Sequence, residues 1–212
     1  MVGADGPADG PAEGVAGTDE RVRPAAAPSR PAPRALVVFG LIAALVVGLD
    51  VFTKYLAVTH LTDRPPVRIL GGLLYLDVIR NSGAAFSVGT GLTWLFPLIA
   101  VVVVGWIVML SRRLRSAAWA VALGLVLGGV FGNLGDRLFR APGFLVGHVV
   151  DFASLFGPDA KYWPVFNVAD ASLCCGVVLV VLLELTDRRR DGSRASAGTA
   201  PGTGSAPGVG SA

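Results

Sequence analysis

Four long apolar segments, separated by polar or glycine-rich connections, constrain this chain more than any other feature of its sequence. They cover about residues 35–58, 91–110, 117–138 and 168–185. A helix of about 20 mostly apolar residues is long enough to cross the hydrocarbon part of a bilayer. We therefore predict an integral membrane protein with four transmembrane helices, of the all-α class.

The composition agrees with a membrane environment and excludes several other classes. Charged residues make up 16% of the chain and hydrophobic residues 53%, whereas an ordinary soluble domain is about a quarter charged. The formal net charge of +3 gives no reason to expect a nucleic-acid partner. The two cysteines, Cys174 and Cys175, are adjacent in an apolar run, so we expect buried thiols and neither a disulfide framework nor a zinc site.

The two ends of the chain differ from its middle. Residues 1–34 and 186–212 are rich in small residues and proline and are poor in large apolar side chains. Such segments cannot bury a core, and we predict that both are disordered tails. The membrane domain is then expected to cover residues 35–185.

Arginine clusters predict the orientation, because positively charged residues concentrate on the cytoplasmic side of a membrane protein. With four spans, all three tight clusters fall on the same side as the two termini. We therefore predict that both termini are cytoplasmic and that the connections 59–90 and 139–167 face outward. The clustered residues are Arg30, Arg34, Arg112, Arg113, Arg115, Arg188, Arg189 and Arg190.

The first outward connection has the pattern of a β-hairpin. Two apolar runs, 67–70 and 73–79, flank the pair Gly71-Gly72. A glycine pair between two such runs is a typical hairpin turn. We expect a small β-structure on the outer surface of the membrane.

Four acids lie within or beside apolar runs, where an ionised side chain is costly. At the centre of a membrane helix the cost is about 2.5–3.5 kcal/mol, so such residues are candidates for function. Asp50 and Lys54 share a helix face and can form an interfacial ion pair. The other three acids are Asp136, Asp151 and Asp170.

Each of these three acids also has a structural interpretation. Asp136 lies one helical turn from Asn133 and beside Arg137, which is compatible with a self-contained polar cap. Asn167 can cap a helix, with Asp170 in the first turn. Asp151, within Val149–Phe152, is harder to explain as a solvated loop residue.

The alternative interpretation is a catalytic pair of carboxylates. Two carboxyls that share a site hold one proton between them, and such a pair can activate water and protonate a leaving group. Neither His60 nor His148 lies in a protease motif. Helical spacing alone does not decide which two of the four acids would form the pair.

Five short motifs occur in a fixed order along the chain. The motifs are D-x-x-T-K (Asp50–Lys54), N-S-G-A-A-F-S (Asn81–Ser87), G-N-L-G-D-R (Gly132–Arg137), V-V-D-F (Val149–Phe152) and F-N-V-A-D (Phe166–Asp170). Together they resemble lipoprotein signal peptidase, also called signal peptidase II, over about residues 35–185.

The resemblance implies an aspartic endopeptidase of the bacterial inner membrane that is inhibited by globomycin. It implies cleavage of prolipoproteins before a diacylglyceryl-modified cysteine, a small extracytoplasmic β-cradle, and no metal or cofactor. It also implies that Asp151 and Asp170 are the catalytic dyad, in an enzyme that we expect to be monomeric and in contact with membrane lipid. The residues implied to shape the site and contact the substrate are Asp50, Lys54, Asn81, Gly83, Asn133, Asp136, Arg137, Asn167 and Ala169.

Two other functions are compatible with intramembrane acids. The first is a proton- or ion-coupled carrier, although four spans without an internal repeat argue against it. The second is a non-catalytic membrane scaffold, which has no evident need for these polar groups. The connections 141–148 and 155–162 lie outside the five motifs, and we expect no contact between them and a motif residue.

Overall fold

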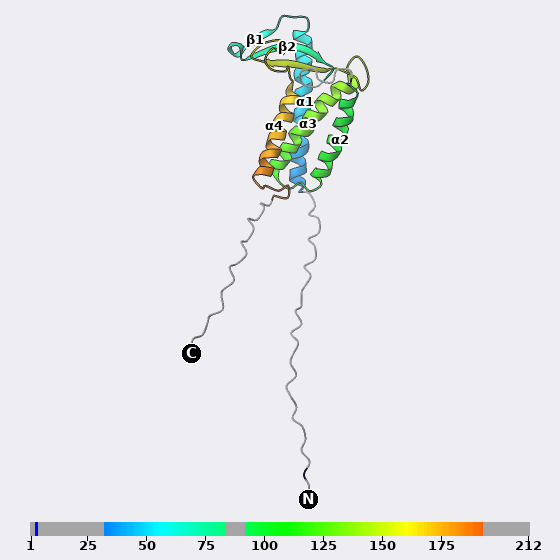
Figure 1. Cartoon of the computed structure of the whole chain (residues 1–212), viewed down its shortest axis with the longest axis vertical. Helices are drawn as coiled ribbons and strands as arrows, with labels where there is room; N and C mark the ends of the chain where they lie inside the picture. The colour runs from blue at the N-terminus through cyan, green and yellow to red at the C-terminus, as the bar shows by residue number, and fades with distance from the viewer. Residues whose placement is uncertain (1–2, 4–31, 84–91, 193–212) are drawn as a thin grey trace.

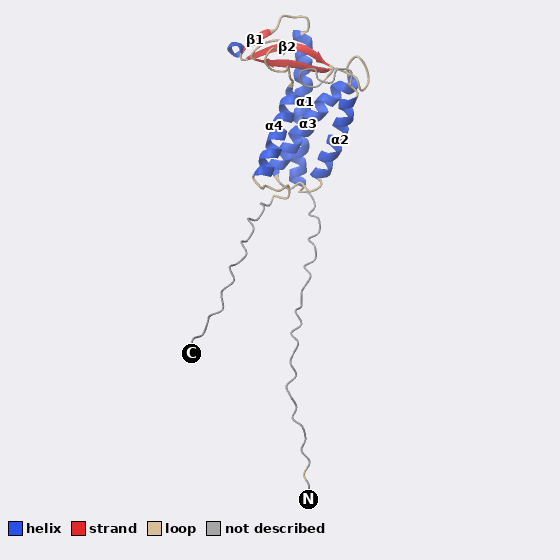
Figure 2. Cartoon of the chain, in the orientation of Figure 1, coloured by secondary structure: helices blue, strands red, loops and turns tan. Residues whose placement is uncertain are grey.

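The structure is a computed structural model that describes Gly3, residues 32–83 and residues 92–192 (Figure 1). Within these residues the helices lie side by side as a bundle, and a small antiparallel sheet covers one end of it (Figure 2). The elements in chain order are α1 (Pro33–Leu61), β1 (Val67–Ile69), the short 3₁₀ helix η1 (Leu70–Gly72), β2 (Leu74–Asn81), α2 (Leu95–Ser111), α3 (Ala117–Phe139), β3 (Val149–Leu155) and α4 (Val168–Leu185).

The predicted helical segments all form helices. In the described part of the chain, α1, α3 and α4 are long and apolar enough to cross a membrane, and α2 is a shorter apolar helix of 17 residues. It begins at Leu95, not near residue 91 as predicted. The helix starts later because the residues before it form a turn, in which the Leu95 N–H donates to the Leu92 carbonyl at 2.9 Å. The Thr93 hydroxyl, in the same turn, donates to the Ser82 carbonyl at 2.9 Å.

α3 lies at the centre of the bundle and packs against the other three helices. Its glycines allow close approach on two sides. A Cβ added at Gly128 would lie 2.6 Å from Val46 Cβ of α1, and one added at Gly129 would lie 2.5 Å from the Ala169 carbonyl of α4. Small residues have this role in membrane proteins, because helices gain van der Waals contact only where their backbones can approach.

The predicted hairpin is present as β1 and β2, and its turn is η1. Gly71 and Gly72 have φ of 69° and 101°, a region that favours glycine. The sheet also has a third strand, β3, which pairs with β2 and places Ile79 opposite Asp151. The prediction of an all-α protein with only a hairpin was therefore incomplete. The strand was missed because Val149–Leu155 is apolar at nearly every position and does not alternate.

Two further predictions differ from the structure. Cys174 and Cys175 are exposed on the outer side of α4 and not buried, because Ala169, Gly176 and Leu183 form its inner side. Residues 186–192, assigned to the C-terminal tail, are packed at the end of the bundle, where Trp119 Nε1 donates to the Arg188 carbonyl at 2.7 Å. The other residues of the predicted tails, apart from Gly3 and those at the start of α1, lie outside the described residues.

We predict that Gly128→Ala destabilises the protein by about 1–3 kcal/mol, the usual cost of overpacking. The new methyl group would lie 2.9 Å from the Ala43 carbonyl, and a backbone atom cannot rotate away. Thermal unfolding in detergent measures the effect. Gly135→Ala, in the same helix, is the matched control because nothing lies within 4 Å of its added Cβ. Equal stability of the two variants would contradict the close packing of α1 on α3.

Candidate active site

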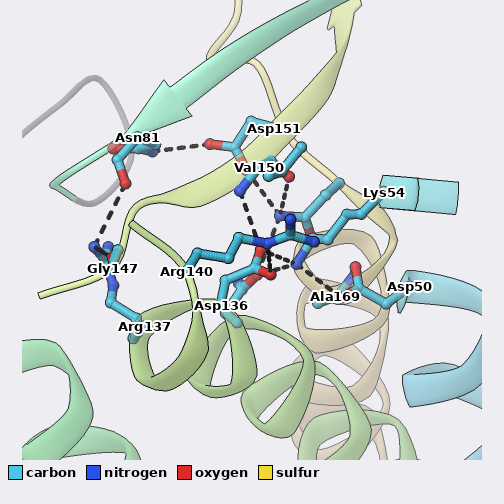
Figure 3. Close-up of polar contacts among 12 residues, drawn as sticks. Asp50, Lys54, Asn81, Asp136, Arg137, Arg140, Gly147, Val150, Asp151 and Ala169 are labelled. Carbon is cyan, nitrogen blue, oxygen red and sulfur yellow. Dashed lines mark hydrogen bonds and ion pairs between the residues drawn. The ribbon is translucent and has the colours of Figure 1, made fainter. Parts of the chain in front are cut away.

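Polar side chains from every long element except α2 meet where the helix bundle joins the sheet (Figure 3). α1 and α3 contribute the charged centre, β2 and β3 lie above it, and the first turn of α4 closes one side. Every site residue predicted from the sequence belongs to this region. They are Asp50, Lys54, Asn81, Gly83, Asn133, Asp136, Arg137, Asp151, Asn167, Ala169 and Asp170.

Lys54 is the centre of the charged group. Its ammonium nitrogen lies 2.7 Å from Asp50 Oδ2 and 2.9 Å from Asp136 Oδ2, and it donates to Asn133 Oδ1 at 3.1 Å. Asp50 and Lys54 are both 0% exposed. The interpretation of these two residues as an interfacial anchor is therefore wrong. Their pairing is correct, but the pair is buried because its helix face meets α3.

Asp50 and Asp136 each make structural contacts besides the one to Lys54. Asp50 Oδ1 accepts the Ala169 N–H at 2.9 Å, which connects α1 to α4. Asp136 pairs with Arg140 and accepts the Val150 N–H at 3.1 Å, which connects α3 to β3. The group around Asp136 is thus not a self-contained polar cap. Both carboxylates are counter-ions to buried or partly buried cations.

Asn167 is the N-cap of α4, as the sequence predicted. Its side chain accepts the Asp170 N–H, and the Asp170 carboxylate accepts the Asn167 N–H at 3.1 Å, so that the two residues form a capping box. The Asn167 amide group also donates to Asp151 Oδ1 at 2.7 Å. One asparagine therefore contacts both Asp151 and Asp170.

Asp151 and Asp170 differ from the other two acids in their partners. Asp151 accepts the amides of Asn81 at 2.9 Å and of Asn167. Asp170 accepts the amide of Asn133 at 2.7 Å and the backbone of Asn167. Among the described residues, neither forms an ion pair, whereas Asp50 and Asp136 both do. This difference separates Asp136 from the other candidates, which spacing could not do.

The protonation of Asp151 is also unusual. Burial, together with the negative charge of Asp170, raises the pKa of Asp151 to about 7 from its ordinary value of 3.8. The amides of Asn81 and Asn167 act in the opposite direction, because they stabilise the ionised form. Asp151 can therefore hold a proton near neutral pH. A carboxyl that does so is suited to general acid catalysis.

Arg137 holds the surrounding backbone in place. Its guanidinium donates to the carbonyls of Asn81, Ser82, Gly83 and Gly147 and lies 4.8 Å from the centre of the Phe96 ring. The Asn81 side chain in turn accepts the Gly83 N–H at 2.9 Å. The remainder of the N-S-G-A-A-F-S motif, residues 84–87, lies outside the described residues.

Sequence reasoning missed three contributors to this region: Arg140, Gly147 and Val150. The expectation that 141–148 contacts no motif residue is wrong, because the Gly147 carbonyl accepts from Arg137 at 3.2 Å and its N–H donates to the Arg137 carbonyl at 3.1 Å. An added Cβ at Gly147 would collide with three carbonyls at the end of α3. Its being glycine was the only available signal. In the described residues, no group of three or more His, Cys, Asp or Glu side chains is arranged to hold a metal ion.

Comparison with known proteins agrees with this geometry. The model of the signal peptidase II family matches residues 42–186. The chain belongs to this family. It is 50% identical over 161 residues to the lipoprotein signal peptidase of Rhodococcus jostii, covering 76% of this chain and 78% of that one. It is 51% identical over 159 residues to that of Mycobacterium avium, covering 75% and 85%.

Two solved structures, both described as bacterial membrane enzymes studied by the in meso method, share the fold. The structure at 2.3 Å resolution has a TM-score of 0.64 and 28% identity, over 76% of this chain and 93% of that one. The structure at 1.9 Å has a TM-score of 0.61 and 30% identity, over 76% and 99%. The protein is therefore an aspartic-type protease of the signal peptidase II family and a bacterial membrane protein, as its motifs indicated.

We predict that Lys54→Met destabilises this signal peptidase II by about 3–5 kcal/mol, because it leaves Asp50 and Asp136 as buried charges without their shared cation. Unfolding of the purified protein in detergent measures the change. Adding Asp50→Asn to the same chain removes the carboxylate left without any cation, since Asp136 still pairs with Arg140, and should recover part of the loss. Wild-type stability of Lys54→Met alone would contradict the central role of this ammonium group.

Proposed function

We propose that this protein removes the signal peptide from diacylglyceryl-modified prolipoproteins by hydrolysing the bond before the lipidated cysteine, with Asp151 and Asp170 as its catalytic dyad. One observation carries the assignment. Of the four acids in the site, only these two receive neutral N–H donors without a cation, and Asn167 contacts both. The membership of the chain in the signal peptidase II family supports the reaction.

The chemistry follows from a pair of carboxyls that hold one proton. The ionised member accepts a proton from a water molecule, and the oxygen of that water attacks the scissile carbonyl. The protonated member donates to the developing oxyanion. Collapse of the tetrahedral intermediate breaks the C–N bond, and the departing amine of the cysteine takes up the proton that the first carboxylate gained from the water. The hydroxyl formed from the oxyanion returns its proton to the second carboxylate, so the pair again holds one proton. The products are a free signal peptide and a lipidated amino-terminal cysteine.

We assign the remaining polar residues to separate roles. Asp50, Lys54 and Asp136 support the site, and Asn133 and Asn167 orient the dyad. We assign contacts with the extended substrate to the backbone near Asn81 and Gly83, which Arg137 holds in place, and to the start of α4 at Ala169. No metal or cofactor is required by this mechanism, and globomycin is expected to inhibit the enzyme.

The proposed membrane placement has four spans within a peptidase domain at 35–185, in the bacterial inner membrane, with both termini cytoplasmic and the enzyme acting as a monomer. The 17 residues of α2 rise about 26 Å at 1.5 Å per residue, near the lower limit for a span. The dyad then lies at the outer membrane surface. A diacylglyceryl group can remain in the bilayer while the peptide bond next to it reaches the two carboxyls.

We predict that Asp151→Asn and Asp170→Asn each reduce cleavage by at least about a thousandfold, because each variant removes one of the two proton-carrying groups. Release of the signal peptide from a diacylglyceryl-modified peptide measures the reaction, with the unlipidated peptide as a substrate control. Asp77→Asn, in the same sheet but bonded to the Asp159 backbone, is the matched control variant. Retained cleavage in either dyad variant would refute the assignment.

The alkaline limb of the pH–rate profile should report the proton on Asp151. Its pKa of about 7 predicts that kcat/KM falls as the pH rises through about 7, where the acid form is lost. Asn81→Ala removes an amide that stabilises the ionised form. The pKa of Asp151 should then rise further, and the limb should move to higher pH.

Arg80→Lys is the control for this measurement, because residue 80 is exposed and keeps its charge. It should leave the limb in place. A shift of the limb to lower pH in Asn81→Ala would contradict the role of Asp151 as the protonated acid.

A further inference from the structure

The end of the bundle opposite the sheet brings together three segments that are far apart in the sequence (Figure 1). The Ala32 N–H, at the start of α1, donates to the Leu114 carbonyl between α2 and α3 at 2.9 Å. The N–H groups of Arg115 and Ser116 donate to the Arg190 carbonyl, after α4, at 2.8 and 3.0 Å. Backbone hydrogen bonds therefore fix the relative positions of all three segments.

Trp119 secures the third of these segments. Its ring is buried, with 1% of the residue exposed, and its Nε1–H donates to the Arg188 carbonyl at 2.7 Å. The Arg190 guanidinium lies 4.9 Å from the centre of the same ring and donates to Glu184 at 2.9 Å. Arg190 thus serves as an internal anchor. Its neighbours Arg188 and Arg189 are exposed.

The result is a concentrated positive surface, which we call the basic face. Its members are Arg34, Arg112, Arg113, Arg115, Arg188 and Arg189, all exposed. The acids of the described chain beside it are three, Glu184, Asp187 and Asp191, which are fewer than the arginines. The whole chain has a net charge of only +3. This end therefore carries an excess of positive charge, which acids elsewhere in the chain offset.

Apolar side chains adjoin the basic face. Val37, Met109 and Leu185 are 59%, 57% and 76% exposed, and each lies three residues from an arginine of the face, on the membrane side. A ligand that fits both surfaces has an anionic group joined to a long apolar part. Guanidinium groups bind phosphate oxygens through paired hydrogen bonds.

We propose that the basic face is a binding surface for the phosphate headgroups of anionic phospholipids, held in shape by Trp119. Charge complementarity favours an anionic headgroup as the occupant. The adjoining apolar side chains favour a ligand with acyl chains over one without them. The proposal rests on the membrane placement given above and is independent of the catalytic dyad. The lipids concerned are those of the leaflet on the side of the two chain termini.

The test uses the full chain in phosphatidylcholine bilayers that contain spin-labelled phosphatidylglycerol or spin-labelled phosphatidylcholine. The measured quantity is the association constant of the anionic lipid relative to that of the zwitterionic one. A basic side chain near an anionic surface contributes about 1 kcal/mol, or about fivefold in affinity. We expect the wild type to prefer phosphatidylglycerol severalfold, and Arg188→Gln with Arg189→Gln to lose most of this preference.

Matched variants separate the basic face from charge in general. Arg64→Gln with Arg80→Gln removes two exposed arginines at the sheet end and should leave the preference unchanged. Trp119→Phe keeps an aromatic ring, smaller than the indole, but loses the N–H donor to the Arg188 carbonyl, and should lower the preference. Cleavage of lipidated peptide in pure phosphatidylcholine should be unaffected in the arginine variants, so a failure of this proposal is distinguishable from a failure of the proposed reaction.

Several outcomes would overturn the proposal. They are equal association of both lipids with the wild type, an equal loss in the sheet-end variant, and full preference in Trp119→Phe, which would refute the role of the tryptophan. Displacement of the labelled lipid by inorganic phosphate, at an ionic strength where sodium chloride has no effect, would indicate a site for free phosphate instead.

Discussion

The rest of the site depends on one buried ammonium group. Lys54 forms ion pairs with Asp50 and Asp136, and it also donates a hydrogen bond to the side-chain oxygen of Asn133. Because that oxygen is turned toward Lys54, the Asn133 amide nitrogen is turned toward Asp170. A similar constraint acts on Asn167, whose oxygen accepts the Asp170 N–H while its nitrogen faces Asp151. The orientation of the Asn133 amide therefore follows from the charge pairing, and that of the Asn167 amide follows from its cap on α4. Together the two amides supply donors to the proposed dyad.

Close helix packing makes this pairing possible. A Cβ at Gly132 would lie 2.6 Å from Asp50 Oδ2 and 2.9 Å from Ala169 Cβ. Only a residue without a side chain lets the carboxylate of α1 pass between α3 and α4 and reach the Ala169 N–H. Burial raises the energetic importance of every such contact, because an ion that loses its partner there has no water to replace it. The glycine and the ion pair are therefore parts of one arrangement.

The sequence predicts the helices and strands better than it predicts the contacts between them. α4 begins and ends where its apolar run does, Asn167 caps it as its residue type indicates, and the glycine pair forms the turn of a hairpin. The burial of Lys54 was not predictable, because spacing within one helix says which residues share a face but not what that face meets. β3 was not predicted for a related reason. A strand whose apolar and polar residues do not alternate has the same sequence pattern as a short apolar loop. Choosing Asp151 and Asp170 required the family motifs, and the structure supplies a physical reason for that choice.

That reason concerns how a protein keeps four acids close together without giving them the same chemistry. Asp50 and Asp136 each face a cation and serve as its counter-ions. Asp151 and Asp170 receive amides, which stabilise a negative charge less strongly and leave one proton able to remain on the pair. Asp151 comes from a strand outside the bundle and Asp170 from the first turn of a helix within it. The proposed dyad thus lies at the boundary between sheet and bundle, so the substrate that we propose would bring its peptide bond to the sheet side while its lipid stays beside the helices.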